Sequence, residues 1–348
     1  MGGLASGGEV VEVHSELPWV TRILERNTGA VGTSDQTMPP SVRLIVERTG
    51  AFTTRGMRVL TRGAYTDDGR VLVLNAGGSG FDMSFTVDGD VLEVHARYAP
   101  GSGTRAANMV LSSRFGLLAG QVLLHYPVFW RSGWRGRVPL HVSVFSSGSG
   151  VPMLAGPGGV GKSTVLVAAM RAGAVATADN LCCADGKVCY GVAEPLRTDA
   201  VGDRGVRTSH GRVSRPFGDR RPALTPDRIV VIERGHHTVM HRIPPVQAVR
   251  TIVAGTYAAG ELRRYWAMAA TLALGTGMGP VHPPIEETAT AMAASLPCSR
   301  LRVGDGQTVT VDQLCDIEAP DAAVPSEAVP SEAVPSEASN PSAEMRLA

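Results

Sequence analysis

The chain has 348 residues, of which 43% are hydrophobic, enough to bury the core of one large domain or two ordinary ones. Its formal net charge of +1 gives no broad attraction to nucleic acid or to an anionic membrane. No apolar run reaches the ~18 residues that a membrane-spanning helix needs. We therefore expect a soluble, cytoplasmic protein without nucleic-acid or membrane partners, and we leave open whether it forms a homo-oligomer.

The cysteines and histidines give little sign of a metal site. The cysteines are odd in number, and no signal peptide with a charged start and an apolar centre precedes them, so reduced and packed thiols are the simplest interpretation. A cluster of three histidines invites a metal interpretation, but its surroundings are typical of a strand and a turn. These residues are Cys182, Cys183, Cys189, Cys298 and Cys315, and His236, His237 and His241.

The first half of the chain reads as a small β-rich domain. Residues 1–40 form a polar N-terminal segment, and residues 41–106 alternate apolar and polar positions in short runs. Turn signals at residues 67–69 and 88–90 separate these runs, which predicts antiparallel hairpins. Residues 107–137 change to helical spacing and form a connector. Its aromatic group, Tyr126, Phe129, Trp130 and Trp134, could line a ligand site, but burial is the more common role of such residues.

Residues 138–318 have the pattern of an α/β domain. A strand, a Ser/Gly hairpin at 146–150 and a second apolar strand lead into a glycine-rich loop, and a helix follows from Ser163 to Arg171. Further strands are expected at 174–178 and 229–233, with a hairpin through 185–186, a basic loop over 204–221 and a helical region from 245 to about 274. The tail, residues 319–348, repeats Ala-Val-Pro-Ser-Glu and is expected to be disordered.

The glycine-rich loop carries the strongest functional signal. Residues 156–164 read Gly-Pro-Gly-Gly-Val-Gly-Lys-Ser-Thr, a phosphate-binding P-loop in the required order of strand, loop and helix. Glycine N–H groups can wrap phosphates, Lys162 can reach the β- and γ-phosphates, and the Ser163 hydroxyl can coordinate Mg²⁺. The predicted ATP-binding set is Gly156, Gly158, Gly159, Val160, Gly161, Lys162, Ser163 and Thr164.

A P-loop alone does not separate an ATPase from a kinase, so a second group near the γ-phosphate is needed. Asp179 follows a strand sixteen residues after Ser163, close enough for one helix and one returning strand to bring it back beside the loop. Its alternative role is that of a turn residue. Glu233 ends the strand 229–232 and is a second candidate carboxylate, although a strand-end acid is the more common interpretation.

Over residues 138–255 the sequence resembles the HPr kinase/phosphorylase catalytic domain and its relatives with a phosphoenolpyruvate-carboxykinase-like P-loop fold. That family has a histidine on the strand upstream of the loop, and His141 stands in the matching place. Its general base is the first of two aspartates; here Asp179 matches the first, and Asn180 replaces the second. Glu194 and Arg197 resemble a later pair that helps to hold metal and phosphate.

The resemblance implies an α/β P-loop kinase domain, preceded by the smaller β-rich domain. It implies that Asp179, Lys162, His141 and Arg197 are catalytic, and that Ser163, Asp179 and Glu194 hold Mg²⁺. The glycine-rich segment with which the family engages its carrier-protein substrate is not visible.

We therefore expect a kinase with a different acceptor, a hydroxyl of a peptide or small molecule. Serine is the favoured acceptor, as in relatives that act on free serine or on precursor peptides of bacterial natural products. The alternatives are an ATPase that drives a conformational change and a non-catalytic ATP-binding module.

Overall fold

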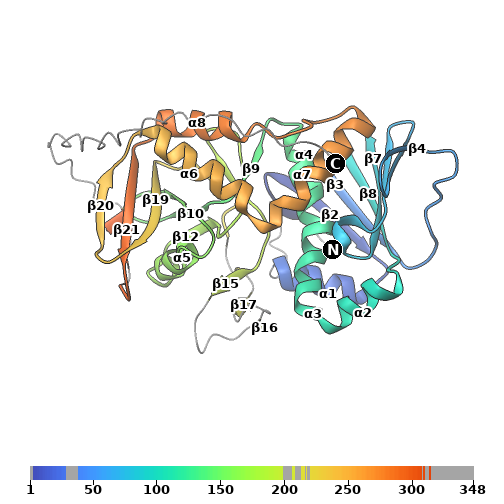
Figure 1. Cartoon of the computed structure of the whole chain (residues 1–348), viewed down its shortest axis with the longest axis horizontal. Coiled ribbons are helices and arrows are strands. Elements are labelled where there is room, and N and C mark those ends of the chain that lie inside the picture. The colour runs from blue at the N-terminus through green and yellow to red at the C-terminus, as the bar shows by residue number, and fades with distance from the viewer. Residues whose placement is uncertain are drawn as a thin grey trace, which may run out of the picture. The chain divides into compact units, whose positions relative to one another are not determined.

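The protein is a mixed α/β structure built around two large sheets (Figure 1). The computed structural model describes residues 3–28, 38–198, 206–207, 213–215, 217, 220–307, 309 and 313–314. Residues 1–316 form one compact unit. The tail predicted for 319–348 and Cys315 lie outside the described residues. The mixed α/β class is confirmed, and the positions of the predicted domain boundaries stay a prediction.

The first sheet has eight strands, and its outer half consists of the predicted hairpins. Strands β5–β6 and β7–β8 pair antiparallel around the turns at 67–70 and 88–91, which confirms the hairpin prediction there. Strand β3, however, runs parallel to both of its neighbours, β2 and β8. In spatial order the strands are β1 (Leu4–Ser6), β2 (Glu9–Ser15), β3 (Val42–Glu47), β8 (Val91–Tyr98), β7 (Phe81–Asp88), β6 (Arg70–Val73), β5 (Ala64–Asp67) and β4 (Arg58–Thr61). The sheet therefore begins inside residues 1–40, which the sequence analysis placed outside the β-rich domain.

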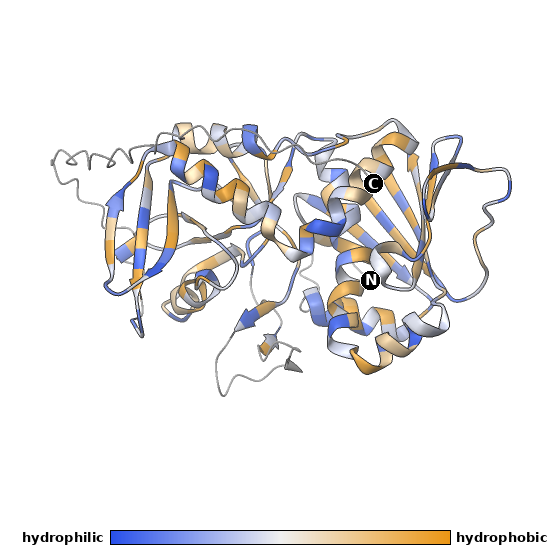
Figure 2. Cartoon of the chain, in the orientation of Figure 1, coloured by the Kyte–Doolittle hydropathy of each residue, from blue (hydrophilic) through white to orange (hydrophobic). Residues whose placement is uncertain are grey.

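One face of this sheet is covered by helices, and α4 and α7 lie between the two large sheets (Figure 1). Strand residues alternate between the buried face and a charged open face, as period-2 patterning requires, and Figure 2 shows hydrophobic and hydrophilic residues side by side along the strands. Helices occupy residues 102–133, where helical spacing was predicted for 107–137, with a break after residue 110 and a π-helical turn. These elements are α1 (Pro18–Thr28), η1 (Ala76–Gly78), α2 (Ser102–Val110), α3 (Ser112–Gly120), η2 (Gln121–His125), α4 (Tyr126–Gly133) and α7 (Gly260–Thr276).

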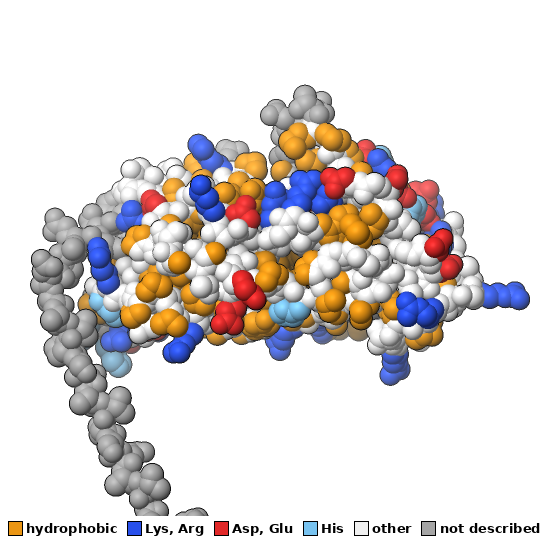
Figure 3. Space-filling model, turned by 90° about the horizontal axis from the view of Figure 1, so that it is seen from above, with side chains coloured by type: hydrophobic (Ala, Val, Ile, Leu, Met, Phe, Trp, Pro, Cys, Tyr) orange, Lys and Arg blue, Asp and Glu red, His pale blue; other side chains and the backbone are white. Residues whose placement is uncertain are grey.

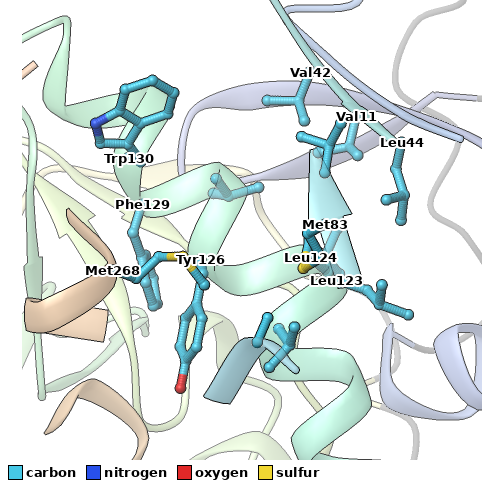
Figure 4. Close-up of a cluster of buried hydrophobic side chains, with 14 of the residues drawn as sticks. Val11, Val42, Leu44, Met83, Leu123, Leu124, Tyr126, Phe129, Trp130 and Met268 are labelled. Carbon is cyan, nitrogen blue, oxygen red and sulfur yellow. The ribbon is translucent and has the colours of Figure 1, made fainter. Parts of the chain in front are cut away.

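The aromatic residues of the connector are part of the core. Tyr126, Phe129 and Trp130 are buried on α4, and Figure 4 shows Tyr126 and Phe129 beside Met268 of α7. The ring centroids of Trp130 and Trp134 lie 5.0 Å apart in an edge-on arrangement. The interpretation as packed aromatics is confirmed for the three buried rings, and none of the four lines the cavity described below.

The second sheet has six strands, and three of them, β11, β19 and β21, are parallel neighbours. Successive residues of β19 point to opposite faces, and both faces are covered: α5 packs on one and α6 with α8 on the other (Figure 1). The elements are β12 (Val175–Ala178), β10 (Ser143–Ser146), β11 (Pro152–Ala155), β19 (Arg228–Gly235), β21 (Cys298–Gly304), β20 (Val239–Arg242), α5 (Lys162–Arg171), α6 (Pro245–Ala258) and α8 (Ile285–Ser295). The predicted strand, loop and helix order around residue 160 is confirmed.

Two small sheets complete the described structure. The first contains β18 (Ala223–Leu224), β14 (Cys189–Gly191), β13 (Cys182–Ala184) and β9 (Val138–Leu140), and the second β15 (Leu196–Thr198), β17 (Val213–Arg215) and β16 (Val206–Arg207). The described parts of the basic stretch 204–221 thus include short strands where a loop was expected. Strand β17 of this stretch, residues 213–215, pairs antiparallel with residues 196–198 of β15.

Two chain segments pass side by side from the small sheet of β9 into the six-stranded sheet. Strand β9 pairs with β13 through Leu140 and Cys182, and β10 pairs with β12 through Val144 and Ala178. Between these pairs, residues 141–142 and 179–181 belong to neither sheet. Strand pairing is interrupted at the same place in both segments, between the β9–β13 pair and the β10–β12 pair. This interruption places His141 beside the segment that carries Asp179.

The surface carries mixed charge. Figure 3 shows basic and acidic side chains scattered among apolar ones, with one dense group of Lys or Arg side chains near the middle of its upper edge. Within the described ranges, no single helix is long and apolar enough to cross a membrane; one bent pair, 102–110 with 112–133, meets the test jointly, by length and composition only.

Candidate active site

The glycine loop, residues 156–161, joins the end of buried strand β11 to the start of α5. Gly156 has φ of 155°, and a Cβ there would lie 2.8 Å from the carbonyl oxygen of Ile232 on β19. Gly161, with φ of 114°, caps α5 without a side-chain hydrogen bond. The first N–H groups of α5 therefore have no capping side chain, and a helix N-terminus in this state is suited to bind an anion.

Lys162 is held inside this loop. Its ammonium group donates hydrogen bonds to the carbonyl oxygens of Gly156 at 2.8 Å and Pro157 at 3.2 Å, and the residue is only 5% exposed. Because a buried ammonium needs acceptors, the loop carbonyls compensate part of its desolvation. The positive charge is thus positioned at the loop before any ligand arrives.

A cavity of about 470 Å³ lies over the loop and the first turns of α5. This volume is within the range of small-molecule sites. The charged side chains that line it are four basic ones and one carboxylate: Lys162, Arg171, Arg197, Arg234 and Glu261. The cavity is therefore electropositive where it meets a helix N-terminus.

His141 faces this cavity as a neutral imidazole. Its Nε2 lies 2.8 Å from Oδ1 of Asn180, and because an amide oxygen can only accept, Nε2 carries the proton. The His141 backbone N–H donates to the hydroxyl of Thr256 on α6. Burial and the charge of Lys162 lower the pKa of His141 to about 4. His141 therefore acts first as a support for Asn180, which also lines the cavity.

Asp179 lies directly behind Ser163. The Ser163 hydroxyl hydrogen-bonds to the Asp179 carboxyl group, and the Arg197 backbone N–H approaches Oδ2 at 3.5 Å. Asp179 is 2% exposed and does not itself line the cavity, whereas Ser163 does. Burial raises the pKa of Asp179, although the hydrogen bond from Ser163 opposes this effect. A carboxylate of raised pKa is a stronger base than an exposed one.

Two carboxylates flank Arg197, and they differ in charge state. Glu194 accepts hydrogen bonds from the backbone N–H groups of Asn180 at 3.0 Å and Leu181 at 2.7 Å, and burial raises its pKa to about 8. Glu261 accepts a hydrogen bond of 2.6 Å from Arg197. Burial opposes ionisation of Glu261, but the charge and hydrogen bond of Arg197 lower its pKa to about 2. At neutral pH, Glu261 is the ionised partner of Arg197.

Buried polar atoms without a hydrogen-bond partner gather around this cavity. In the described part of the chain they include His141 Nδ1, Asp179 Oδ1, Asn180 Nδ2, Glu194 Oε2 and Arg197 Nε, with Glu194 Oε2 only 3.6 Å from an Arg197 amino nitrogen. Native proteins leave few such atoms unsatisfied, because each costs about 1–3 kcal/mol. Their concentration here is typical of a site that a ligand completes.

The structure brings most of the predicted site residues together. The residues that line the cavity are His141, Gly158, Gly159, Gly161, Lys162, Ser163, Thr164 and Arg197. The predicted residues that do not line it are Gly156, Val160, Asp179 and Glu194. The carbonyl oxygen of Gly156 accepts a hydrogen bond from Lys162, and Val160 packs in the core under α5. Asp179 and Glu194 are buried behind the cavity wall.

Ten residues of this lining were not predicted, and four of them carry charged or amide side chains: Arg171, Asn180, Arg234 and Glu261. Arg234 follows Glu233 on β19, and the sequence signal was assigned to Glu233. That residue forms an ion pair with Arg300 at 3.2 Å and does not line the cavity. Glu261 lies in the first turn of α7, and its signal is the sequence Ala-Ala-Gly-Glu at 258–261, which breaks the predicted long helix.

No metal cluster of the predicted alternative kind occurs among the residues described. No three His, Cys, Asp or Glu side chains gather there in a way that could hold an ion. His241 lies on β20 and is exposed, as the interpretation of strand and turn predicts. Cys182, Cys183 and Cys189 are buried free thiols, as expected.

The comparisons with known proteins add no family assignment. No protein-family model matches this chain, and no curated protein matches it either.

Proposed function

We propose that this protein is an ATP-dependent kinase that transfers the γ-phosphoryl group to a hydroxyl, with serine as the favoured acceptor. We further propose that it is a divergent relative of the HPr kinase family with a P-loop kinase fold. The observation that carries the proposal is the meeting of the glycine loop, Lys162 and the Ser163–Asp179 pair at one electropositive cavity.

The residues that line the cavity fit a nucleoside triphosphate. The uncapped start of α5 offers backbone N–H groups, and Lys162 and Arg197 offer charge-assisted hydrogen bonds. A Cβ at Gly158 or Gly159 would meet no atom within 4 Å, so both glycines face open space where phosphates can approach the backbone. This arrangement supports binding of a polyphosphate along the loop.

Mg²⁺ fits at Ser163 and Asp179. Both offer the hard oxygen ligands that this ion prefers, and Oδ1 of Asp179 is buried without a partner. When bound, the ion would neutralise phosphate charge. Glu194 fits less well, because one of its oxygens already accepts two backbone N–H groups and the other faces Arg197. We propose that Glu194 supports the 179–181 segment.

The transfer chemistry follows from these placements. Asp179 would take the proton from the acceptor hydroxyl as its oxygen attacks the γ-phosphorus in line, and the bond to the β-phosphate oxygen would break to release ADP. Lys162 and Arg197 would stabilise the charge spread over the transferred group. Asp179 is buried and interacts with the hydroxyl of Ser163, which lines the cavity.

The first test uses the two lysines of the chain. Lys162→Gln should weaken binding of a fluorescent ATP analogue by about tenfold to a hundredfold, since a hydrogen bond to a charged group contributes about 1.5–3 kcal/mol. Lys187→Gln is the matched control, because Lys187 is exposed on the 185–188 turn. Equal affinity of wild type and Lys162→Gln would refute nucleotide binding at the loop.

The second test separates a kinase from its alternatives. Wild type and Asp179→Asn are incubated with Mg-ATP and free serine or serine-containing peptides, and the products are analysed by mass spectrometry. We expect gain of one phosphoryl group, reduced about a hundredfold or more in the variant. ADP release without any phosphorylated acceptor would indicate an ATPase, and ATP binding without turnover a non-catalytic module.

A further inference from the structure

A second cavity, of about 530 Å³, adjoins the first. Arg197, Gly260 and Glu261 line both, so the Arg197–Glu261 ion pair stands between them. The far walls of the second cavity come from α3, η2 and α7. A ligand group in this cavity would therefore lie on the opposite side of Arg197 from the glycine loop.

The second cavity is rich in arginine. Arg114 on α3 and Arg263 and Arg264 on α7 line it, and all three are exposed. Within the described residues none of them has an ion-pair partner, and the one carboxylate in the lining, Glu261, is already bound to Arg197. The Arg197 side chain is 19% exposed, and its buried Nε has no hydrogen-bond partner there. The cavity is thus lined by three arginines without an ion-pair partner in the described residues and by Arg197, whose buried Nε–H has no hydrogen-bond partner there.

The remaining lining is apolar or amide. Leu117 and Leu118 form an apolar wall, and Gln121 contributes a side-chain amide. Binding sites of this kind combine apolar surface with a few placed polar groups that orient the ligand. Arginine prefers carboxylate and phosphate partners because its planar fork matches their geometry. The lining fits a ligand with an aliphatic part and one or more carboxylates.

We propose that this cavity is the acceptor subsite and that it selects an acceptor with carboxylates beside its hydroxyl. The carboxylates lie among Arg114, Arg263 and Arg264, and the hydroxyl reaches past Arg197 to the glycine loop. Its role as an acceptor subsite rests on the proposed kinase function, whereas its preference for carboxylates does not. An acidic peptide segment and a free carboxylate-bearing amino acid share this chemistry, and the experiment distinguishes them.

The arrangement also assigns a role to the connector. Helix α3 lies before the glycine loop in the sequence and packs beside α1, yet it supplies one wall of the subsite. Acceptor specificity would then depend on residues from both halves of the chain.

The test measures binding of labelled peptides to the full chain by fluorescence anisotropy. One peptide carries a serine flanked by Asp and Glu, and its partner carries Asn and Gln at the same positions. Wild type is compared with the double variant Arg263→Gln/Arg264→Gln. The control is Arg250→Gln, because Arg250 is exposed on α6 and lines neither cavity. Unlabelled free serine and aspartate serve as competitors in the second arm.

We expect wild type and Arg250→Gln to bind the acidic peptide about tenfold more tightly than the neutral one, with the preference weakened by added salt. The double variant should lose most of this preference. Displacement of the peptide by free amino acids would favour a small-molecule acceptor, and its absence a peptide. Equal binding of both peptides by wild type, no binding of either, or a preference kept in the double variant would overturn the proposal.

ATP-analogue affinity, measured on the same samples, separates the two failures. If the charge preference holds while ATP is not bound, the kinase proposal fails and the anionic subsite stands. If ATP is bound and transferred without any charge preference, the subsite proposal fails and the kinase stands.

Discussion

Replacing Glu261 by glutamine should show how the charge of the partly buried Arg197 is balanced. The substitution keeps the size of the side chain and an oxygen that can accept the hydrogen bond, but it removes the charge that lies 2.6 Å from the guanidinium. The pKa of Glu261 is about 2, against an ordinary value of 4.5, and at about 1.4 kcal/mol per pKa unit this difference corresponds to about 3–4 kcal/mol of interaction. That value is the upper bound for the loss of folding stability.

The measured loss should be smaller, because a second carboxylate can take over. Glu194 lies 3.6 Å from Arg197, and the negative charge of Glu261 is one reason that its pKa is about 8. Once Glu261 is neutral, the pKa of Glu194 falls and Glu194 ionises near neutral pH. We therefore expect Glu261→Gln to cost about 1–2 kcal/mol at pH 7.

The double variant Glu261→Gln/Glu194→Gln makes this reasoning testable. Glu194→Gln alone should be close to neutral at pH 7, because Glu194 is mostly protonated there and a glutamine oxygen can still accept both backbone N–H groups. The double variant leaves the partly buried Arg197 without a carboxylate, so its loss should exceed the sum of the single losses by about 1 kcal/mol or more. Urea denaturation of the four proteins gives the free energies of unfolding. Additive losses would refute the idea that the two carboxylates share one cation.

Two further predictions concern stability and the loop. His95 lies between two carboxylates on the open face of the eight-stranded sheet; burial lowers its pKa, but its hydrogen bonds to them raise the pKa above 6.5 overall. This stabilisation is complete below pH 6.5 and is lost as the pH rises through the folded-state pKa of His95. The substitution His95→Gln should therefore cost about 1 kcal/mol of folding stability at about pH 6 and much less at about pH 9. Equal losses in urea denaturation at both pH values would contradict this prediction. Gly156→Ala should abolish binding of the ATP analogue, because the new Cβ would meet the Ile232 carbonyl oxygen at 2.8 Å. Gly158→Ala should leave folding intact, because a Cβ there meets nothing within 4 Å. Thermal unfolding and the binding assay check both variants.

Local patterns predicted the parts of the site that are continuous in sequence. The strand, loop and helix around Lys162 follow from apolar runs and glycine spacing, and Asp179 follows from the length of one helix and one strand. The burial of Asp179 behind Ser163 could not be predicted, because it depends on how two strands leave the six-stranded sheet at one level. The same break places His141 against Asn180.

Contacts between residues far apart in the sequence could not be predicted either, because they too depend on how the elements are placed in the fold. Arg197 and Glu261 are 64 residues apart, and their contact depends on where α6 ends and α7 begins, at the Ala259–Gly260 break. A periodicity argument predicts one helical region there and gives no reason for the break. In the first sheet, the parallel pairing of β2 and β3 likewise depends on α1, which lies in the 1–40 segment that the sequence analysis placed outside the β-rich domain.

The protonation states of the buried carboxyl groups explain how an acid-containing site can remain electropositive. If Glu194 and Glu261 were both ionised, they would cancel much of the charge of the surrounding basic groups. Burial instead raises the pKa of Glu194 to about 8, so Glu194 is mostly neutral at pH 7, and Glu261 is bound to Arg197. The charged lining of the cavity is then four basic side chains against one carboxylate, which suits a ligand with several negative charges. Both proposals use this imbalance: the glycine-loop side would receive phosphates, and the far side of Arg197 the carboxylates of the acceptor.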